Sequence, residues 1–148
     1  LFSAAMLNRL AFYLSPIAVL FLVGYSFSKR VTWLSHWLLG LTDSIAPAGA
    51  WIAVRPSLGD ATMYWLMLAV TFWIAGFDLI YACQDSDFDR RVGLHALPAR
   101  FGNHTALWVA RLSHLVALMA LILVGLSAHL LWPYWVGMLL VTGGMVYE

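Results

Sequence analysis

Charged residues are scarce in this sequence. Only 10% of its 148 residues are Asp, Glu, Lys or Arg, and 63% are hydrophobic, whereas a typical soluble domain has about a quarter charged residues and about half apolar ones. The mean hydropathy of +0.84 shows the same imbalance. A soluble globular domain is therefore excluded, and a membrane protein is indicated. The net charge of +1 lacks the basic excess of a nucleic-acid-binding protein, so we expect no nucleic-acid partner.

Cysteine is almost absent as well. The single cysteine, Cys83, excludes an internal disulfide, so the cysteine content does not indicate a redox compartment. We expect Cys83 to be a small packing residue. The sequence starts at Leu1 rather than at a methionine and ends at Glu148 inside a hydrophobic run, and from its first residues we expect no signal peptide. These features predict a single transmembrane domain, residues 1–148, that is an incomplete part of a longer protein.

Five hydrophobic segments have about the length of a transmembrane helix. A hydrocarbon core of about 30 Å needs about 20 apolar residues per helix, and a helix satisfies its own backbone polar groups inside the bilayer. Alternating segments of about ten residues, typical of membrane β-barrels, are absent. The predicted fold is an all-α, polytopic transmembrane helical bundle. Its segments run from Leu10 to Ser28, Thr32 to Val54, Ala61 to Cys83, His104 to Leu126, and Trp132 to Glu148.

The cations between these segments are distributed unequally. Loops on the cytoplasmic side of membrane proteins carry an excess of Lys and Arg. One side of the predicted bundle has five such residues and the other has only Arg9 and Arg55. The loop of residues 84–103 is therefore predicted to be cytoplasmic. The five cations on its side are Lys29, Arg30, Arg90, Arg91 and Arg100.

Acidic residues gather at the end of the third segment. If that helix continued, Asp78, Tyr81, Asp85 and Asp89 would share a stripe about 80° wide, and Asp87 would point to the other side. Carboxylates four residues apart repel each other on a helix, and a divalent cation would offset this repulsion. Mg²⁺ is typically bound by one or two carboxylates together with substrate phosphates. The alternative is a solvated acidic loop that pairs with the neighbouring arginines.

Several polar residues near this segment have two interpretations. Asp78 lies at membrane depth, where an ionisable group is usually functional or paired, and Arg111 of the fourth segment is a candidate partner. Tyr81 either orients a substrate or is an interfacial aromatic residue. Arg100 either binds a diphosphate oxygen or anchors the membrane interface. It precedes Asn103, the expected N-cap of the fourth helix.

Two further residues have less distinct roles. Asp43 lies in the middle of the second segment, so we expect it to face the bundle interior, where it pairs with another helix or lines a pocket. His36 lies near a predicted helix end, and an interfacial role suffices for it. The small residues from Gly40 to Ala50 in the same segment would allow close helix packing.

Two motifs resemble conserved blocks of the UbiA-type prenyltransferases, most closely those of the 4-hydroxybenzoate branch. The first runs from Asp78 to Gly102, with the pattern Asp-x-x-Tyr-Ala-x-Gln-Asp-x-x-Phe-Asp followed by Gly-Leu-His-Ala-Leu-Pro-Ala-Arg-Phe-Gly. The second, residues 25–32, resembles Tyr-Pro-Phe-x-Lys-Arg-x-Thr, with Ser26 where proline is common. The other aspartate block of the family, Asn-Asp-x-x-Asp, is missing. The family fold has nine transmembrane helices, of which this chain would supply about five.

The resemblance implies an enzyme of ubiquinone or menaquinone biosynthesis. Such an enzyme transfers a polyprenyl group from polyprenyl diphosphate to an aromatic acid acceptor such as 4-hydroxybenzoate, with Mg²⁺ as cofactor. A bacterial inner (plasma) membrane is the implied location. The implied roles are Mg²⁺ binding for Asp85 and Asp89, catalysis near the acceptor ring for Asp78 and Tyr81, and substrate binding for Tyr25, Ser26, Lys29, Arg30 and Arg100.

Two other functions remain open. A membrane cation-binding transporter would use the same acidic residues, but it predicts carboxylates along a pore near the bilayer midplane. The acids Asp85, Asp87 and Asp89 lie instead at the predicted membrane edge. The second alternative is a truncated prenyltransferase that is inactive on its own.

Overall fold

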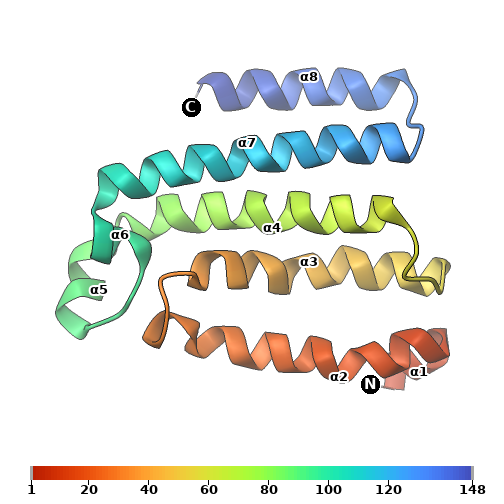
Figure 1. Cartoon of the computed structure of the whole chain (residues 1–148), viewed down its shortest axis with the longest axis horizontal. Coiled ribbons are helices and arrows are strands. Elements are labelled where there is room, and N and C mark those ends of the chain that lie inside the picture. The colour runs from red at the N-terminus through yellow and green to blue at the C-terminus, as the bar shows by residue number, and fades with distance from the viewer. Residues whose placement is uncertain (1, 148) are drawn as a thin grey trace.

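The computed structural model describes residues 2–147 and contains only helices as regular structure within that range. The long helices lie side by side in chain order, each antiparallel to the next (Figure 1). Two short helices, α5 and α6, lie together at one end of the bundle. The elements are α1 (Phe2–Leu7), α2 (Arg9–Gly24), the 3₁₀ helix η1 (Tyr25–Arg30), α3 (Ser35–Val54), α4 (Ala61–Ala82), α5 (Ser86–Val92), α6 (Leu97–Phe101), α7 (Asn103–Ser127) and α8 (Trp132–Tyr147).

Four of the five predicted spans are confirmed by length and hydropathy. The helical stretches that could cross a membrane are Arg9–Arg30, Ser35–Val54, Ala61–Ala82 and Asn103–Ser127. The fifth predicted span corresponds to α8, which has 16 residues in the described part of the chain. The protein is therefore an all-α membrane protein built as a helical bundle.

The centre of the bundle consists of α3, α4 and α7, and small side chains lie at its interfaces. The backbones of α3 and α4 approach so closely that a Cβ on Gly40 would lie 2.1 Å from the carbonyl oxygen of Thr71. Ala75 of α4 and Ala106 and Ala117 of α7 are fully buried. Such residues favour helix association in membranes because the backbones can come close together.

The long loop between α4 and α7 is anchored at both of its ends. The expectation that Asn103 caps α7 is wrong, because Gly102, with φ of 86°, occupies the N-cap position. The Asn103 side chain instead donates a hydrogen bond to the carbonyl oxygen of Cys83 at 3.2 Å. Gly93, with φ of 73°, ends α5 in the left-handed conformation, which glycine adopts without strain. Pro98 lies in the first turn of α6, where a helix does not use the backbone N–H that proline lacks.

Candidate active site

Two segments that are far apart in the sequence meet at one end of the bundle. The backbone N–H of His95 donates a hydrogen bond to the carbonyl oxygen of Lys29, with an N···O distance of 2.8 Å. This bond joins the loop that carries α5 and α6 to η1. In Figure 1, α5 and α6 lie at the same end of the bundle as the turn between α2 and α3. The predicted substrate-binding motif and the acidic segment therefore lie at one end.

The acidic segment is not the continuous helix that we predicted. α4 ends at Ala82, and tight turns follow, with hydrogen bonds from the N–H of Gln84 to Tyr81 O (3.0 Å) and from the N–H of Asp85 to Ala82 O (3.3 Å). α5 then begins with Asp85 at its N-cap position. A continuing helix would place these carboxylates at its negative C-terminal end, and the break places them at the positive N-terminal end of a new helix.

The carboxylates of the acidic segment lie in two different environments. Asp89 is only 4% exposed, and its Oδ2 has no hydrogen-bond partner among residues 2–147. Asp85 is exposed and forms no ion pair within that range. The Asp87 side chain is 78% exposed, and its Oδ1 lies 3.4 Å from Arg90 Nη1. The alternative of an acidic loop paired with arginines therefore describes Asp87 and leaves Asp85 and Asp89 unexplained.

Asp78 has a partner that the sequence did not suggest. Its Oδ2 lies 2.6 Å from Nδ1 of His36, which is 0% exposed. The same imidazole accepts a hydrogen bond at Nε2 from the backbone N–H of Leu97, at 3.2 Å. The interfacial role expected for His36 is therefore wrong. Asp78 needs a partner at its depth, and the start of α3 lies beside the end of α4, so the topology together with Asp78 was the signal for this pairing.

Arg111 and Asp43 do not make the expected contacts among residues 2–147. Arg111 does not pair with Asp78 but lies over the ring of Trp108, at 5.3 Å from the ring centroid. Asp43 does not face the packed interior of the described bundle but is exposed. The helix face that carries Asp43 is not one that α4 covers, whereas its neighbours Thr42 and Ser44 are buried.

The predicted substrate-binding residues belong to two elements. Tyr25, Ser26, Lys29 and Arg30 lie on η1, which the sequence presented as the end of a transmembrane helix and a loop. Tyr25 and Lys29 are half-buried, whereas Ser26 and Arg30 are exposed. Arg100 lies on α6 with its guanidinium 5.3 Å from the ring centroid of Phe101. Within residues 2–147 none of these three cations forms an ion pair, so their charges are available to an anion.

A cavity begins beside the acidic segment and extends along the helices. It has a volume of about 780 Å³ and lies between α4, α7 and α8. Tyr81, which is 64% exposed, lines it together with Gln84, Arg111 and His114. The other lining residues are all apolar. Such a cavity fits a molecule with one polar end and an apolar body.

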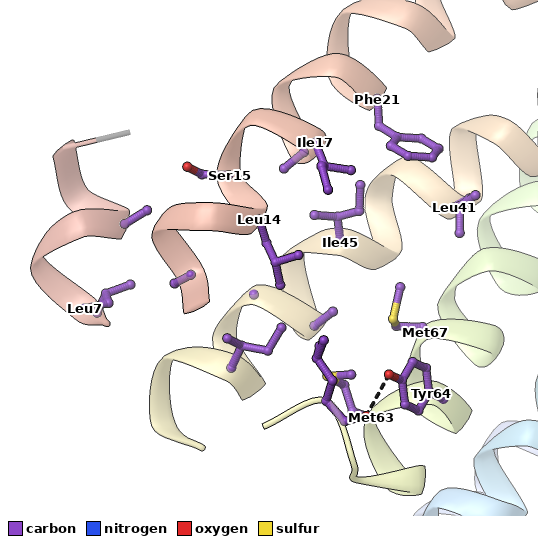
Figure 2. Close-up of a pocket in the computed structure, with 17 residues that line it drawn as sticks. Leu7, Leu14, Ser15, Ile17, Phe21, Leu41, Ile45, Met63, Tyr64 and Met67 are labelled. Carbon is purple, nitrogen blue, oxygen red and sulfur yellow. Dashed lines mark hydrogen bonds between the residues drawn. The ribbon is translucent and has the colours of Figure 1, made fainter. Parts of the chain in front are cut away.

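A second cavity, of about 470 Å³, lies at the opposite end of the bundle. Figure 2 shows it between α1 and α2 on one side and α3 and α4 on the other, with Leu14, Ile45 and Met67 directed into it. Ser15 and Tyr64 bring the only polar side-chain atoms among the residues that line it, and the Tyr64 hydroxyl donates to Leu58 O at 2.7 Å. This cavity has no charged lining residue, so it is unsuited to a diphosphate.

The whole chain matches a known family. The model of the UbiA prenyltransferase family matches residues 1–148. A solved structure, described as the apo structure of a UbiA homolog from Aeropyrum pernix K1, superposes with a TM-score of 0.90 at 32% sequence identity. The superposition covers 98% of this chain and 55% of that one.

Curated relatives show the same similarity over part of their length. The mitochondrial 4-hydroxybenzoate polyprenyltransferase of Arabidopsis thaliana is 30% identical over 142 residues, which cover 96% of this chain and 35% of the relative. The 4-hydroxybenzoate octaprenyltransferase of Burkholderia pseudomallei (strain K96243) is 31% identical over 143 residues, 96% of this chain and 49% of the relative. The chain thus spans about a third to a half of the length of these relatives.

Proposed function

The chain belongs to the UbiA prenyltransferase family, and from this premise we propose that it forms part of an enzyme that transfers a polyprenyl group from a polyprenyl diphosphate to an aromatic acid. The relatives' names make 4-hydroxybenzoate the first acceptor to test. Such transfer would serve ubiquinone or menaquinone biosynthesis. The observation that carries the proposal is the buried Asp89 carboxylate, which has an oxygen without a partner among residues 2–147. It lies at the end of the bundle where Lys29, Arg30 and Arg100 also lie.

Asp85 and Asp89 fit a Mg²⁺ ion. They are one helical turn apart, with a hydrogen bond of 2.8 Å between the N–H of Asp89 and the carbonyl of Asp85. An unpartnered buried carboxylate is costly, and a cation would relieve this cost. Mg²⁺ typically binds through one or two carboxylates plus substrate phosphates, and these two carboxylates would supply the protein's share of its ligands. When bound, Mg²⁺ would neutralise the diphosphate as a leaving group.

The chain's own cations would hold the diphosphate from two sides. Lys29 and Arg30 approach from η1 and Arg100 from α6, and charge-assisted hydrogen bonds to phosphate oxygens are among the strong ones in proteins. The hydroxyls of Tyr25 and Ser26 add neutral donors on η1. Arg30 alternatively binds the carboxylate of the acceptor.

Asp78 and Tyr81 would act at the acceptor ring. In the reaction, the C–O bond between the prenyl group and the diphosphate breaks, a bond forms between the prenyl carbon and a ring carbon, and that ring carbon loses its proton. His36 occupies Oδ2 of Asp78, which leaves Oδ1 to accept this proton. Tyr81, one turn further along α4 and 64% exposed, would orient the ring. The apolar part of the 780 Å³ cavity would accommodate the isoprenoid chain.

The proposed location in the cell follows from the membrane-spanning helices and the distribution of cations. The four helices that can cross a membrane make the protein an integral membrane protein. We propose that the loop of residues 84–103 faces the cytoplasm, because it and η1 carry most of the cations between the spans. Water-soluble diphosphate would then be released on the cytoplasmic side. A bacterial inner membrane is the proposed setting.

The test compares three aspartates of one short segment in membranes that contain the full-length protein. The assay measures Mg²⁺-dependent transfer of a radiolabelled isoprenoid from its diphosphate to 4-hydroxybenzoate. Asp85→Asn and Asp89→Asn should lower transfer by more than about 100-fold, since even the outer partners of metal ligands cost about 10- to 100-fold. Asp87→Asn is the matched control, because Asp87 is exposed and paired with Arg90, and it should keep near-normal activity.

Two results would contradict the proposal in different ways. If the Asp85 and Asp89 variants transfer as well as the Asp87 variant, the metal lies elsewhere. If folded wild-type protein transfers no prenyl group to any aromatic acceptor, the enzyme assignment fails. Uptake of a divalent cation into vesicles would then test the transporter alternative.

A further inference from the structure

His36 is the most completely buried polar side chain at the acidic end of the bundle. It is 0% exposed at the start of α3 and bridges two other elements, α4 through Asp78 and α6 through Leu97. The hydrophobic cluster beside it contains Leu79 and Leu97, with the partly buried Trp33 packed against them. Apolar groups therefore exclude water from the buried bond to Leu97, which strengthens it. The bond to Asp78 is partly buried, because the Asp78 side chain is 21% exposed.

The two hydrogen bonds determine the tautomer of the imidazole. A backbone N–H can only donate, so Nε2 must present its lone pair to Leu97. The single ring proton then lies on Nδ1, which donates to Oδ2 of Asp78 at 2.6 Å. A second proton on Nε2 would break the bond to Leu97 and leave its N–H buried without a partner, which is costly. His36 is therefore neutral and bonded at both nitrogens.

Each bond fixes a different part of the proposed site. The bond to Asp78 restrains the carboxylate so that Oδ2 is occupied and Oδ1 is left for another ligand. The bond to Leu97 uses an N–H of the first turn of α6, one of the donors that a helix cannot satisfy itself. α6 carries Arg100 three residues further on. A single side chain thus connects the carboxylate on α4 to the cation on α6.

We propose that His36 is a positioning residue, which holds the Asp78 carboxylate and the α6 segment with Arg100 in fixed relation to each other. This inference rests on the proposed function, because Asp78 and Arg100 are assigned to opposite parts of the same reaction. His36 itself has no exposed atom and touches neither substrate. Its effect on catalysis is therefore exerted through Asp78 and Leu97.

The kinetic test uses one disruptive variant, one conservative variant and one control. His36→Leu replaces the imidazole with an apolar side chain of similar size and removes both hydrogen bonds, so kcat should fall about 10- to 100-fold. His36→Gln supplies one N–H donor and one carbonyl acceptor and should restore most of kcat. The control is Met63→Ala, which creates a cavity in the core at the other end of the bundle. It should lower thermal stability without lowering kcat. Wild-type kcat in His36→Leu, or equal impairment in the Leu and Gln variants, would overturn the proposal.

A spectroscopic test works on unsubstituted protein and does not depend on activity. Nitrogen-15 NMR of the His36 ring should show the proton on Nδ1, with Nε2 unprotonated, and the Leu97 amide should exchange slowly with deuterated solvent. A proton on Nε2, or a fast-exchanging Leu97 amide, would overturn the inference even if His36→Leu does not fold. If wild-type protein transfers no prenyl group, the proposed function fails, and these two signals alone decide whether His36 holds both partners.

Discussion

The central helices α3, α4 and α7 differ sharply from the outer helices α2 and α8. Among the side chains that the structure describes, most buried ones lie on the central helices. α2 has no buried residue, and Met138 is the one buried core residue in the described part of α8. The stretch that contains α2 is nevertheless more hydrophobic than α3 or α4. Hydropathy therefore does not determine which helices pack closely, because lipid solvates an apolar side chain as well as another helix does.

Small residues and single polar contacts account for the difference. The α3–α4 and α4–α7 interfaces contain Gly40, Ala75, Gly76 and Ala110, which allow the backbones to approach. The outer helices make fewer apolar contacts, such as those of Leu10 and Leu14 of α2 with the cluster around Met63, and single hydrogen bonds add to these contacts. One such hydrogen bond runs from the Tyr134 hydroxyl of α8 to Leu121 O of α7, at 2.7 Å. The comparison predicts that a substitution which forces two central backbones apart costs more than one which detaches an outer helix.

The largest effect is expected at Gly40. Gly40→Ala places a Cβ 2.1 Å from the carbonyl oxygen of Thr71, so the backbones of α3 and α4 must separate. We expect a loss of about 3 kcal/mol or more in the free energy of unfolding, at the upper end of overpacking costs. Reversible unfolding of the full-length protein in mixed micelles, followed by circular dichroism, measures this loss.

Gly49→Ala is the matched control on the same helix. No atom lies within 4 Å of the added Cβ, and alanine is the better helix former by about 0.5–1 kcal/mol. The control should therefore be neutral or slightly stabilising. A similar loss in both variants would show that helix propensity, not the contact with Thr71, sets the cost.

An intermediate effect is expected at Asn8, which attaches α2. Its Oδ1 accepts from the N–H of Ala11 at 2.8 Å and caps α2, and its Nδ2 donates to Ile52 O of α3 at 2.9 Å. Asn8→Ala should cost about 2 kcal/mol, about one for the cap and about one for the hydrogen bond. Hydrogen exchange should increase in α1 and α2 and remain unchanged in α4 and α7. Asn8→Asp keeps the cap and should lose about half as much.

A smaller effect is expected at Gly76, although it also lies at a central interface. A Cβ there would lie 2.3 Å from the ring of His114, and a ring at the end of a side chain can move where a backbone carbonyl cannot. Gly76→Ala should cost about 1 kcal/mol and change the fluorescence of Trp73, whose ring centroid lies 5.8 Å from that of His114. A cost as large as that of Gly40→Ala would show that the imidazole is held as firmly as the backbone.

The sequence predicted the helices better than their packing. Long apolar runs predict spans because every backbone polar group must be satisfied in lipid, and four predicted spans correspond to apolar helices of sufficient length. The same runs do not show which face is buried. Of the small residues expected to pack, Gly40 and Ala48 are buried, whereas Ala46, Gly49 and Ala50 are exposed.

The sequence indicated which segments form the candidate site but not how they are arranged. The motifs identified the segments around Lys29 and Asp89, and a hydrogen bond from His95 to Lys29 joins them. The helix break at Asp85 was missed because a constant rotation per residue was assumed beyond the last apolar turn. His36 was missed because the pairing spans 42 residues and becomes visible only when the start of α3 is placed beside the end of α4.

The smallest effect concerns the junction between α4 and α7, where Cys83 reports on packing. Burial raises the pKa of the Cys83 thiol, and its Sγ donates to Leu79 O at 3.3 Å. Because the thiolate is the reactive form, a raised pKa lowers the thiolate fraction at neutral pH. Maleimide labelling should therefore be slower than for an exposed thiol and should still accelerate above the usual thiol pKa. Asn103→Ala removes the hydrogen bond to Cys83 O and should speed labelling severalfold without a measurable loss of stability, whereas an unchanged rate would show that the central helices hold this junction without Asn103.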